Sequence, residues 1–131
     1  GDIAPREYQR QAARTEVDST GYAPAFACMD RYDKRRRLLH AAMGMQTEAA
    51  EFTDTLKKHL IYNKPLDFVN LIEELGDSLW YHALACNALG VSLEDVCRKN
   101  IEKLKARYPE KFTEEAALNR DLDKEREVLE K

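Results

Sequence analysis

Residues that interrupt helices are scarce in this sequence, which has only five glycines and four prolines among 131 residues. Long apolar stretches are lacking too, since no run of about 18 apolar residues occurs that could cross a bilayer. The three cysteines form an odd number without a C-x-x-C pair, which argues against a disulfide framework or a zinc site. Because no basic and apolar leader opens the chain, we expect a cytoplasmic protein with reduced thiols and no membrane contact.

Neither sign of charge dominates, because 21 basic and 24 acidic residues leave a formal net charge of -3. This balance offers no basic surface for a nucleic acid. The basic run at residues 34–37 (KRRR) has no aromatic neighbours and no second basic patch, so a solvated helix start explains it. A small, diffusible substrate is therefore expected, and no nucleic-acid partner.

The composition and the apolar spacing predict an all-α fold, a helical bundle of about four to five helices. The length fits a single domain over residues 1–131. Its core is expected at residues 34–112, followed by a charged C-terminal helix at 113–131. Within these ranges the breakers and caps predict helices at residues 5–16, 34–62, 66–89, 92–107 and 113–131.

Two long helices are expected to pair antiparallel through apolar seams. The seam of the first helix has steps of three and four residues and comprises Leu38, Ala42, Met45, Ala49, Phe52, Leu56 and Leu60. The seam of the second helix is expected to face inwards and comprises Phe68, Leu71, Ile72, Leu75, Leu79 and Cys86. Three principal helices can scarcely enclose such a core alone. We therefore expect a homodimer or homotetramer whose interface completes the bundle and contributes to the site.

Two pairs of carboxylates stand three residues apart, Glu48 with Glu51 and Glu74 with Asp77. Side chains three apart on a helix project from one side, whereas Glu73 turns to the opposite flank. If the two long helices pack antiparallel, the four carboxylates converge. Such a group repels itself unless a cation neutralises it.

The alternative is that each carboxylate is an ordinary solvated helix residue. The flanking residues weaken this alternative, because alanines surround the first pair (TEAAEF) and apolar residues the second (LIEELGDSLW). Gly76 lies inside a helix at a cost of about 1 kcal/mol, which indicates a close approach there. A hard cation suits carboxylate ligands, and we expect Mg²⁺, with Mn²⁺ as a substitute.

A third helix supplies the opposite charge, because Asn100, Lys103 and Arg107 fall within about 60° of one another. In a functional interpretation Lys103 and Arg107 bind phosphate oxygens, and the Asn100 amide holds sugar or phosphate. The competing interpretation is an ordinary solvated helix face.

Four aromatic residues are candidates for a nucleotide pocket: Phe26, His40, Trp80 and Tyr81. Tyr81 stands one turn beyond Asp77 and is expected either to contact a nucleoside or to pack in the core. His40 could enter the pocket, although a lone histidine is more often structural. Core or subunit packing is the preferred role of Trp80.

At this point the sequence resembles the MazG-type all-α nucleotide pyrophosphohydrolases, over roughly residues 38–112. The resemblance rests on TEAAE (47–51), EELGDSLWYHALACNALG (73–90) and NIEKLKARYPEKF (100–112). It implies Mg²⁺ ligands at Glu48, Glu51, Glu74 and Asp77, and nucleotide contacts at Asn100, Lys103, Arg107 and Tyr108. Either Glu48 or Glu51 is expected to be the general base.

The expected reaction is Mg²⁺-dependent hydrolysis of a (deoxy)nucleoside triphosphate between the α and β phosphates. The products are a monophosphate and pyrophosphate, and the role is control of nucleotide pools. One alternative is a non-catalytic helical interaction protein on the same scaffold. Another is a di-iron carboxylate bundle, which normally needs E-x-x-H motifs that this chain lacks.

Overall fold

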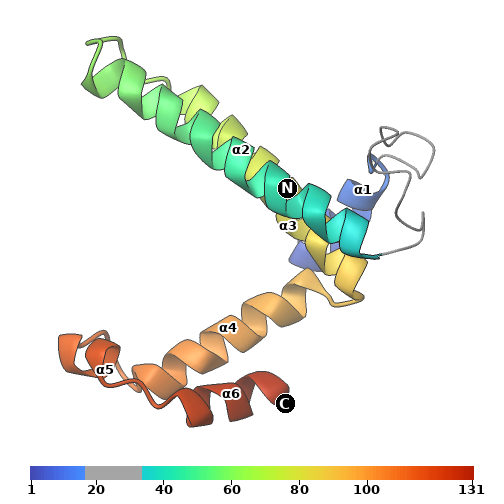
Figure 1. Cartoon of the computed structure of the whole chain (residues 1–131), viewed down its shortest axis with the longest axis vertical. Helices are drawn as coiled ribbons and strands as arrows, with labels where there is room; N and C mark the ends of the chain where they lie inside the picture. Colours follow the sequence, from blue (N-terminus) through green and yellow to red (C-terminus); the bar gives the residue numbers. More distant parts are fainter. Residues whose placement is uncertain (17–33) are drawn as a thin grey trace. The chain divides into compact units, whose positions relative to one another are not determined.

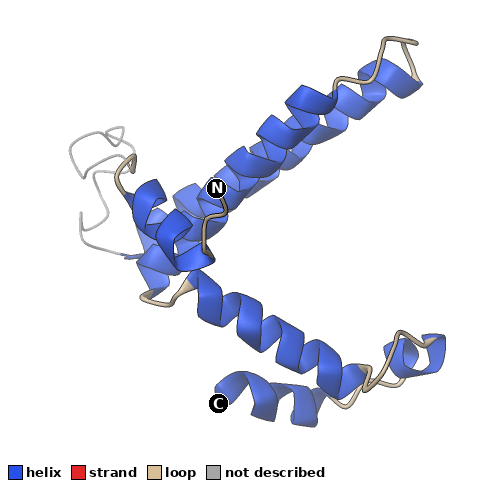
Figure 2. Ribbon diagram, turned by 180° about the vertical axis from the view of Figure 1, so that it is seen from behind, coloured by secondary structure: helices blue, strands red, loops and turns tan. Residues whose placement is uncertain are grey.

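The computed structural model describes residues 1–16 and 34–131, and Figure 1 shows these as helices joined by short connections. Six helices follow one another along the described ranges: α1 (Pro5–Ala13), α2 (Lys34–Leu60), α3 (Phe68–Leu89), α4 (Leu93–Arg107), α5 (Glu114–Leu118) and α6 (Leu122–Glu130). No strand occurs in these ranges (Figure 2). The predicted all-α fold is confirmed. None of the helices described has the length and apolar character that a membrane span requires.

The helices begin and end at residues with the expected backbone chemistry. Pro5 occupies the first turn of α1, where its missing N–H costs nothing. The Asp67 carboxylate accepts a hydrogen bond from the Asn70 N–H at 3.0 Å and caps α3. Gly90 ends α3 in the left-handed region at φ 69°, and Asn63, at φ 55°, lies in the turn after α2. The predicted boundaries of the long helices are thus confirmed to within a few residues.

The C-terminal segment differs from the prediction, because it forms two short helices in place of one charged helix over 113–131. The Thr113 hydroxyl accepts from the Ala116 N–H at 3.1 Å and starts α5. Asn119 ends that helix, and Asp121 then caps α6 by accepting from the Lys124 N–H at 3.0 Å. Side chains that cap a helix compete with its continuation, and this competition explains the break.

The chain forms two compact units, Gly1–Ser92 and Leu93–Lys131. In the first unit α2 and α3 lie side by side and antiparallel, and α1 packs on α3 (Figure 1). In the second unit α6 packs on α4. The single domain over residues 1–131 stays a prediction.

The apolar stripe of α3 was expected to face inwards, and for most of its length this expectation is wrong. Phe68, Ile72, Leu75 and Leu79 have exposed fractions of 68%, 69%, 59% and 42%. On that face only Cys86 is buried, and Leu71 is half-buried. Taking about 100° per residue, this stripe lies about 180° from the α3 face that carries Glu74 and Asp77. Because α2 packs against the carboxylate side, unit 1 leaves the apolar side of α3 uncovered.

Small residues allow α2 to approach its neighbours closely. Ala41, Gly44 and Thr55 are the buried members of its central part. Leu60 at its end is 71% exposed, although it belongs to the predicted seam. The helix therefore uses a face of small side chains for contact, and its apolar seam lies beside that face.

Buried polar groups fix α1 on α3. The side-chain amide of Gln9 donates to Asn87 Oδ1 at 2.8 Å and lies 2.9 Å from the Val91 carbonyl oxygen. The Tyr8 hydroxyl lies 3.4 Å from the Gly76 carbonyl oxygen, within donating distance. These contacts join residues from the beginning and the end of unit 1 in the sequence.

Replacing Gln9 by Ala should lower the free energy of unfolding by about 1–3 kcal/mol, because two hydrogen bonds of roughly 0.5–1.5 kcal/mol each are lost from a buried donor. Urea unfolding followed by circular dichroism measures this. The matched control is Gln11→Ala, which removes only local bonds, one to Glu7 in the same helix and one from Arg14 just after it. An equal loss in both variants would show that the bonds to Asn87 and Val91 do not anchor α1.

Candidate functional site

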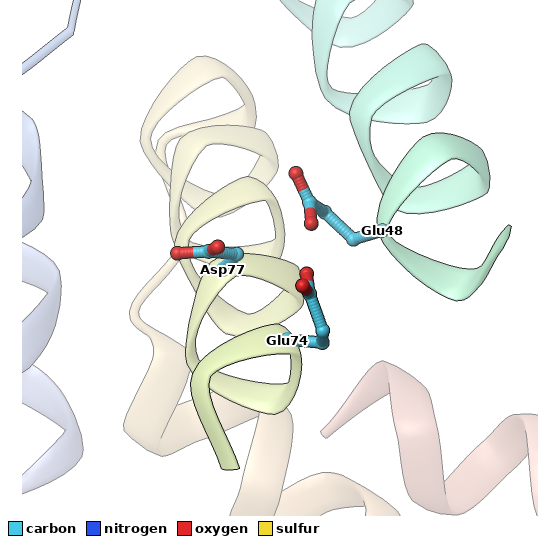
Figure 3. A group of neighbouring side chains, drawn as sticks. All are labelled: Glu48, Glu74 and Asp77. Carbon is cyan, nitrogen blue, oxygen red and sulfur yellow. The ribbon is translucent and has the colours of Figure 1, made fainter. Parts of the chain in front are cut away.

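Three of the four predicted carboxylates meet where α2 faces α3. Glu48 reaches from α2 towards Glu74 and Asp77 on α3 (Figure 3). One carboxylate oxygen from each lies within 4.8 Å of the others. Glu74 is buried, Glu48 half-buried and Asp77 exposed. The group is therefore open on the Asp77 side and closed on the Glu74 side.

Glu51 is not a member of this group, so the structure brings together three of the four predicted carboxylates. It lies one turn along α2 from Glu48 and is exposed. Glu51 lines a shallow surface hollow together with Ala50, Thr53, Asp54 and Lys57. Glu73 is exposed and also outside the group, as helical geometry predicted.

The neighbouring carboxylates make Glu48 harder to ionise. Partial burial raises the pKa of Glu48 to about 6, and a hydrogen bond with Glu74 and the charges of Asp77, Glu74 and Glu51 act in the same direction. Proton and cation therefore compete for the same oxygens.

A divalent cation fits this donor set. All three side chains offer oxygen, the ligand that hard cations such as Mg²⁺ and Mn²⁺ prefer. Glu48, Glu74 and Asp77 would hold it, and its charge would relieve the repulsion that raises the pKa of Glu48. Among the residues that the structure describes, no histidine or cysteine belongs to the group, so they do not indicate a soft-metal site.

Without a cation, the free energy of unfolding should fall as the pH rises from 4.5 through 6, because the folded pKa of Glu48, about 6, lies above its usual 4.5. The loss amounts to about 2 kcal/mol at most, reduced by solvent screening. Urea unfolding in EDTA at pH 4.5 and 7.5 measures it. Because other groups also titrate, Glu48→Gln is the comparison: this variant should lose less stability over the same interval. An equal loss in both proteins would contradict the assignment.

An aromatic groove adjoins the carboxylates. Glu48, Asp77, Trp80, Tyr81 and Thr15 line it. The Trp80 and Tyr81 rings meet edge to face with centroids 5.0 Å apart, and the Trp80 indole N–H donates to the Thr15 hydroxyl at 2.7 Å. Trp80 therefore borders the groove, whereas the sequence favoured packing of this residue in the core or between subunits.

His40 belongs to the same aromatic cluster. Its ring centroid lies 5.7 Å from that of Tyr81 and 6.4 Å from that of Trp80, again edge to face. Three of the four predicted pocket residues are thus together, and Phe26 lies outside the described residues. The connection at residues 19–26 (STGYAPAF), a segment that contains glycine and proline, also lies outside them.

The close approach occurs at Gly44 and not at Gly76. A Cβ added to Gly44 would lie 2.1 Å from a Tyr81 ring carbon, whereas one at Gly76 would meet nothing within 4 Å. The Tyr81 ring thus packs closely against Gly44 of α2, one turn from Glu48. A larger residue at position 44 would displace this ring and with it one wall of the groove.

Sequence reasoning missed the contribution of α1. The Tyr8 hydroxyl lies beside Gly76, and burial together with the charge of Asp77 raises the pKa of Tyr8. Thr15 lines the groove. The signal was weak, because a helix with polar residues on several faces does not reveal which of them meets a site elsewhere in the chain.

The predicted phosphate-binding residues belong to the second unit. Asn100 is exposed, and Lys103 and Tyr108 are half-buried. Arg107 is engaged within this unit, since its Nε lies 2.6 Å from the buried Glu125 carboxylate, to which Arg120 also binds at 2.7 Å. These bonds lower the pKa of Glu125 to about 2. Arg107 thus holds α6 on α4, a role that the helix spacing did not reveal.

The all-α fold and an acidic group between two helices define a class of helical proteins that could hold a metal. Within it, the model of the MazG nucleotide pyrophosphohydrolase domain matches residues 38–112, and the chain belongs to this family. It is similar to the "Gene 37 protein" of Mycobacterium phage L5, with 34% identity over 106 residues, covering 76% of this chain and 84% of that protein. No solved structure gives a significant match.

Proposed function

We propose that this protein is a Mg²⁺-dependent hydrolase that converts a (deoxy)nucleoside triphosphate to the monophosphate and pyrophosphate. The observation that carries the proposal is the position of the Glu48, Glu74 and Asp77 group, directly beside an aromatic groove. A cation site next to flat rings suits a ligand with a polyphosphate at one end and a base at the other. Membership of the family supports the same reaction class.

Glu48, Glu74 and Asp77 would hold Mg²⁺, with Mn²⁺ as a substitute. The cation would supply charge for the phosphate oxygens and acidity for a water molecule. We assign the proton acceptor to Glu51 in preference to Glu48, because Glu51 is exposed and outside the three-membered group. If Glu51 were instead a fourth ligand, its removal would weaken cation binding as well as the rate.

The groove would receive the nucleoside. Trp80 and Tyr81 offer ring edges and faces, and Thr15 offers a hydroxyl group at its rim. His40 supports the two rings from behind by its edge-to-face contacts. Discrimination between bases would depend on these side chains, since the carboxylates meet only the phosphates.

The phosphates or the sugar would be bound by the residues that the family resemblance implies, which are Asn100, Lys103, Arg107 and Tyr108. Arg107 could do so only by sharing or exchanging its contact with Glu125. Lys103 is the better candidate for charge neutralisation, because its flexible ammonium can rotate towards a phosphate, whereas Arg107 is held by Glu125.

The exposed stripe of α3 would bind a second copy of this chain. Phe68, Ile72, Leu75 and Leu79 follow the spacing i, i+4, i+7, i+11, which is the seam of a two-helix contact. A self-complementary apolar stripe suits a two-fold dimer. Such pairing would cover the apolar face of α3 that unit 1 leaves exposed. A tetramer would bury apolar side chains between copies in the same way.

The test is pyrophosphate release from each common dNTP and NTP with Mg²⁺ and with EDTA. We expect release from at least one nucleotide, dependent on the cation, consistent with cytoplasmic control of nucleotide pools. Calorimetric titration with Mg²⁺ accompanies the assay. Intact cation binding without turnover of any nucleotide would reject the hydrolase and favour a non-catalytic interaction protein.

A further inference from the structure

We propose that Asn70 and Thr55 are positioning residues that fix the Glu74 carboxylate before a cation binds, an inference that rests on the proposed metal site. Neither residue belongs to the carboxylate pairs. Both lie close to Glu74 in the structure, one on α3 and one on α2.

A chain of side-chain hydrogen bonds connects the two helices at the carboxylate group. Asn70 Nδ2 donates to Glu74 Oε1 at 3.2 Å, one turn along α3. The Thr55 hydroxyl donates to Asn70 Oδ1 from α2. The same hydroxyl also lies 3.3 Å from the Glu51 carbonyl oxygen. Thr55 and Glu74 are both buried, so water cannot easily replace these partners.

The chemistry of the partners fixes the direction of this chain. An ionised carboxylate can only accept, so the Asn70 amide must turn its NH₂ group towards Glu74. Its oxygen then faces α2, where only a donor is acceptable, and the Thr55 hydroxyl is that donor. Each member therefore holds the next in one orientation.

This arrangement has the form of support for a metal ligand. Hydrogen bonds to ligating carboxylates orient them and reduce the reorganisation needed on binding, and their loss typically weakens metal affinity 10–100-fold. The bond from Asn70 holds Oε1 of Glu74 and thereby the orientation of the whole carboxylate. Because Glu74 is the most buried of the three carboxylates, its rotamer is the one that these two residues can control.

The test measures Mn²⁺ affinity of the full chain by calorimetric titration. Asn70→Leu, which keeps the size but removes the donor, should weaken binding about 10–100-fold, and Thr55→Val about 10-fold or less. Thr55→Ser, which keeps the hydroxyl, should restore the wild-type affinity. The matched control is Thr53→Val, since the exposed Thr53 hydroxyl bonds only to the Ala49 carbonyl of its own helix. This control should bind Mn²⁺ as the wild type does.

Two further measurements separate positioning from a structural role. If Asn70 acts through Glu74, Asn70→Leu should weaken Mn²⁺ binding little further in a Glu74→Gln background. The free energy of unfolding without metal is measured for every variant. Loss of stability with affinity within twofold of wild type would overturn the inference. Should Asn70→Leu not fold, Thr55→Val and Thr55→Ser decide the matter.

The outcomes also distinguish this inference from the proposed function. If Glu74→Gln weakens Mn²⁺ binding and neither Asn70→Leu nor Thr55→Val does, the positioning inference fails and the metal site stands. If the wild type binds no Mn²⁺, both are rejected.

Discussion

Replacing Asp77 by Asn should lower the rate of pyrophosphate release by more than about 100-fold. Loss of a residue that only supports a ligand typically costs 10–100-fold, and Asp77 is expected to be a ligand itself. The carboxamide keeps the shape of the side chain but loses the negative charge that balances a divalent cation. Asp77 is exposed, so the substitution should not disturb the core. A steady-state pyrophosphate assay at saturating Mg²⁺ measures the effect.

Glu73→Gln is the matched control for this experiment. It removes the same charge from α3, but Glu73 is exposed and outside the carboxylate group. The control should retain the wild-type rate. Since removal of one of three repelling carboxylates relieves strain in the cation-free protein, Asp77→Asn should also unfold no more easily than the wild type. Retained activity in Asp77→Asn, or an equal loss in Glu73→Gln, would reject the ligand assignment.

Glu51→Gln completes the comparison, because the two proposed roles predict different binding data. If Glu51 accepts the proton from water, the rate should fall while Mg²⁺ affinity stays close to that of the wild type. If Glu51 is a fourth ligand, rate and affinity should fall together.

Replacing Ile72 by Asp should convert the proposed dimer to monomers. Ile72 is 69% exposed in the single chain and lies in the middle of the apolar stripe of α3. Burying an isoleucine contributes about 1.5–3 kcal/mol, and a two-fold interface loses this twice. A total of roughly 4 kcal/mol corresponds to a dissociation constant about 1,000-fold higher. Sedimentation velocity over a range of protein concentrations measures this change.

The control again uses Glu73, which lies next to Ile72 in sequence but about 100° away around the helix. Glu73→Lys should leave the sedimentation coefficient unchanged. If the wild type is monomeric at all concentrations, or if Ile72→Asp still dimerises with the wild-type constant, a second copy does not cover this stripe. Such a result would leave the apolar face of α3 for another partner.

The sequence predicted the local structure of this chain well, because that structure depends on neighbours along the helix. Pro5 and Gly90 stand where backbone chemistry starts and ends a helix, and in the structure they begin α1 and end α3. The break between α5 and α6 was missed, since Asp121 acts as a cap only once the preceding helix has ended at Asn119. Short polar segments leave that choice to small differences in free energy.

The candidate site was predictable as far as its carboxylates stand at helical spacing. Glu48, Glu74 and Asp77 could be identified in this way, as could the exclusion of Glu73. The position of Glu51 outside the group could not be predicted. Residues three apart diverge by about 60° around a helix, and packing decides which of them meets the neighbouring helix.

Contacts between distant residues were decided by the tertiary structure alone. No spacing rule connects Thr55 with Asn70, Gly44 with the Tyr81 ring, or Trp80 with Thr15. These pairings depend on how far one helix slides and turns against another. The sequence by itself determined the helices and the carboxylates they carry. Only the packing decided which three carboxylates meet, because a helix presents every face to solvent until a neighbour covers one of them.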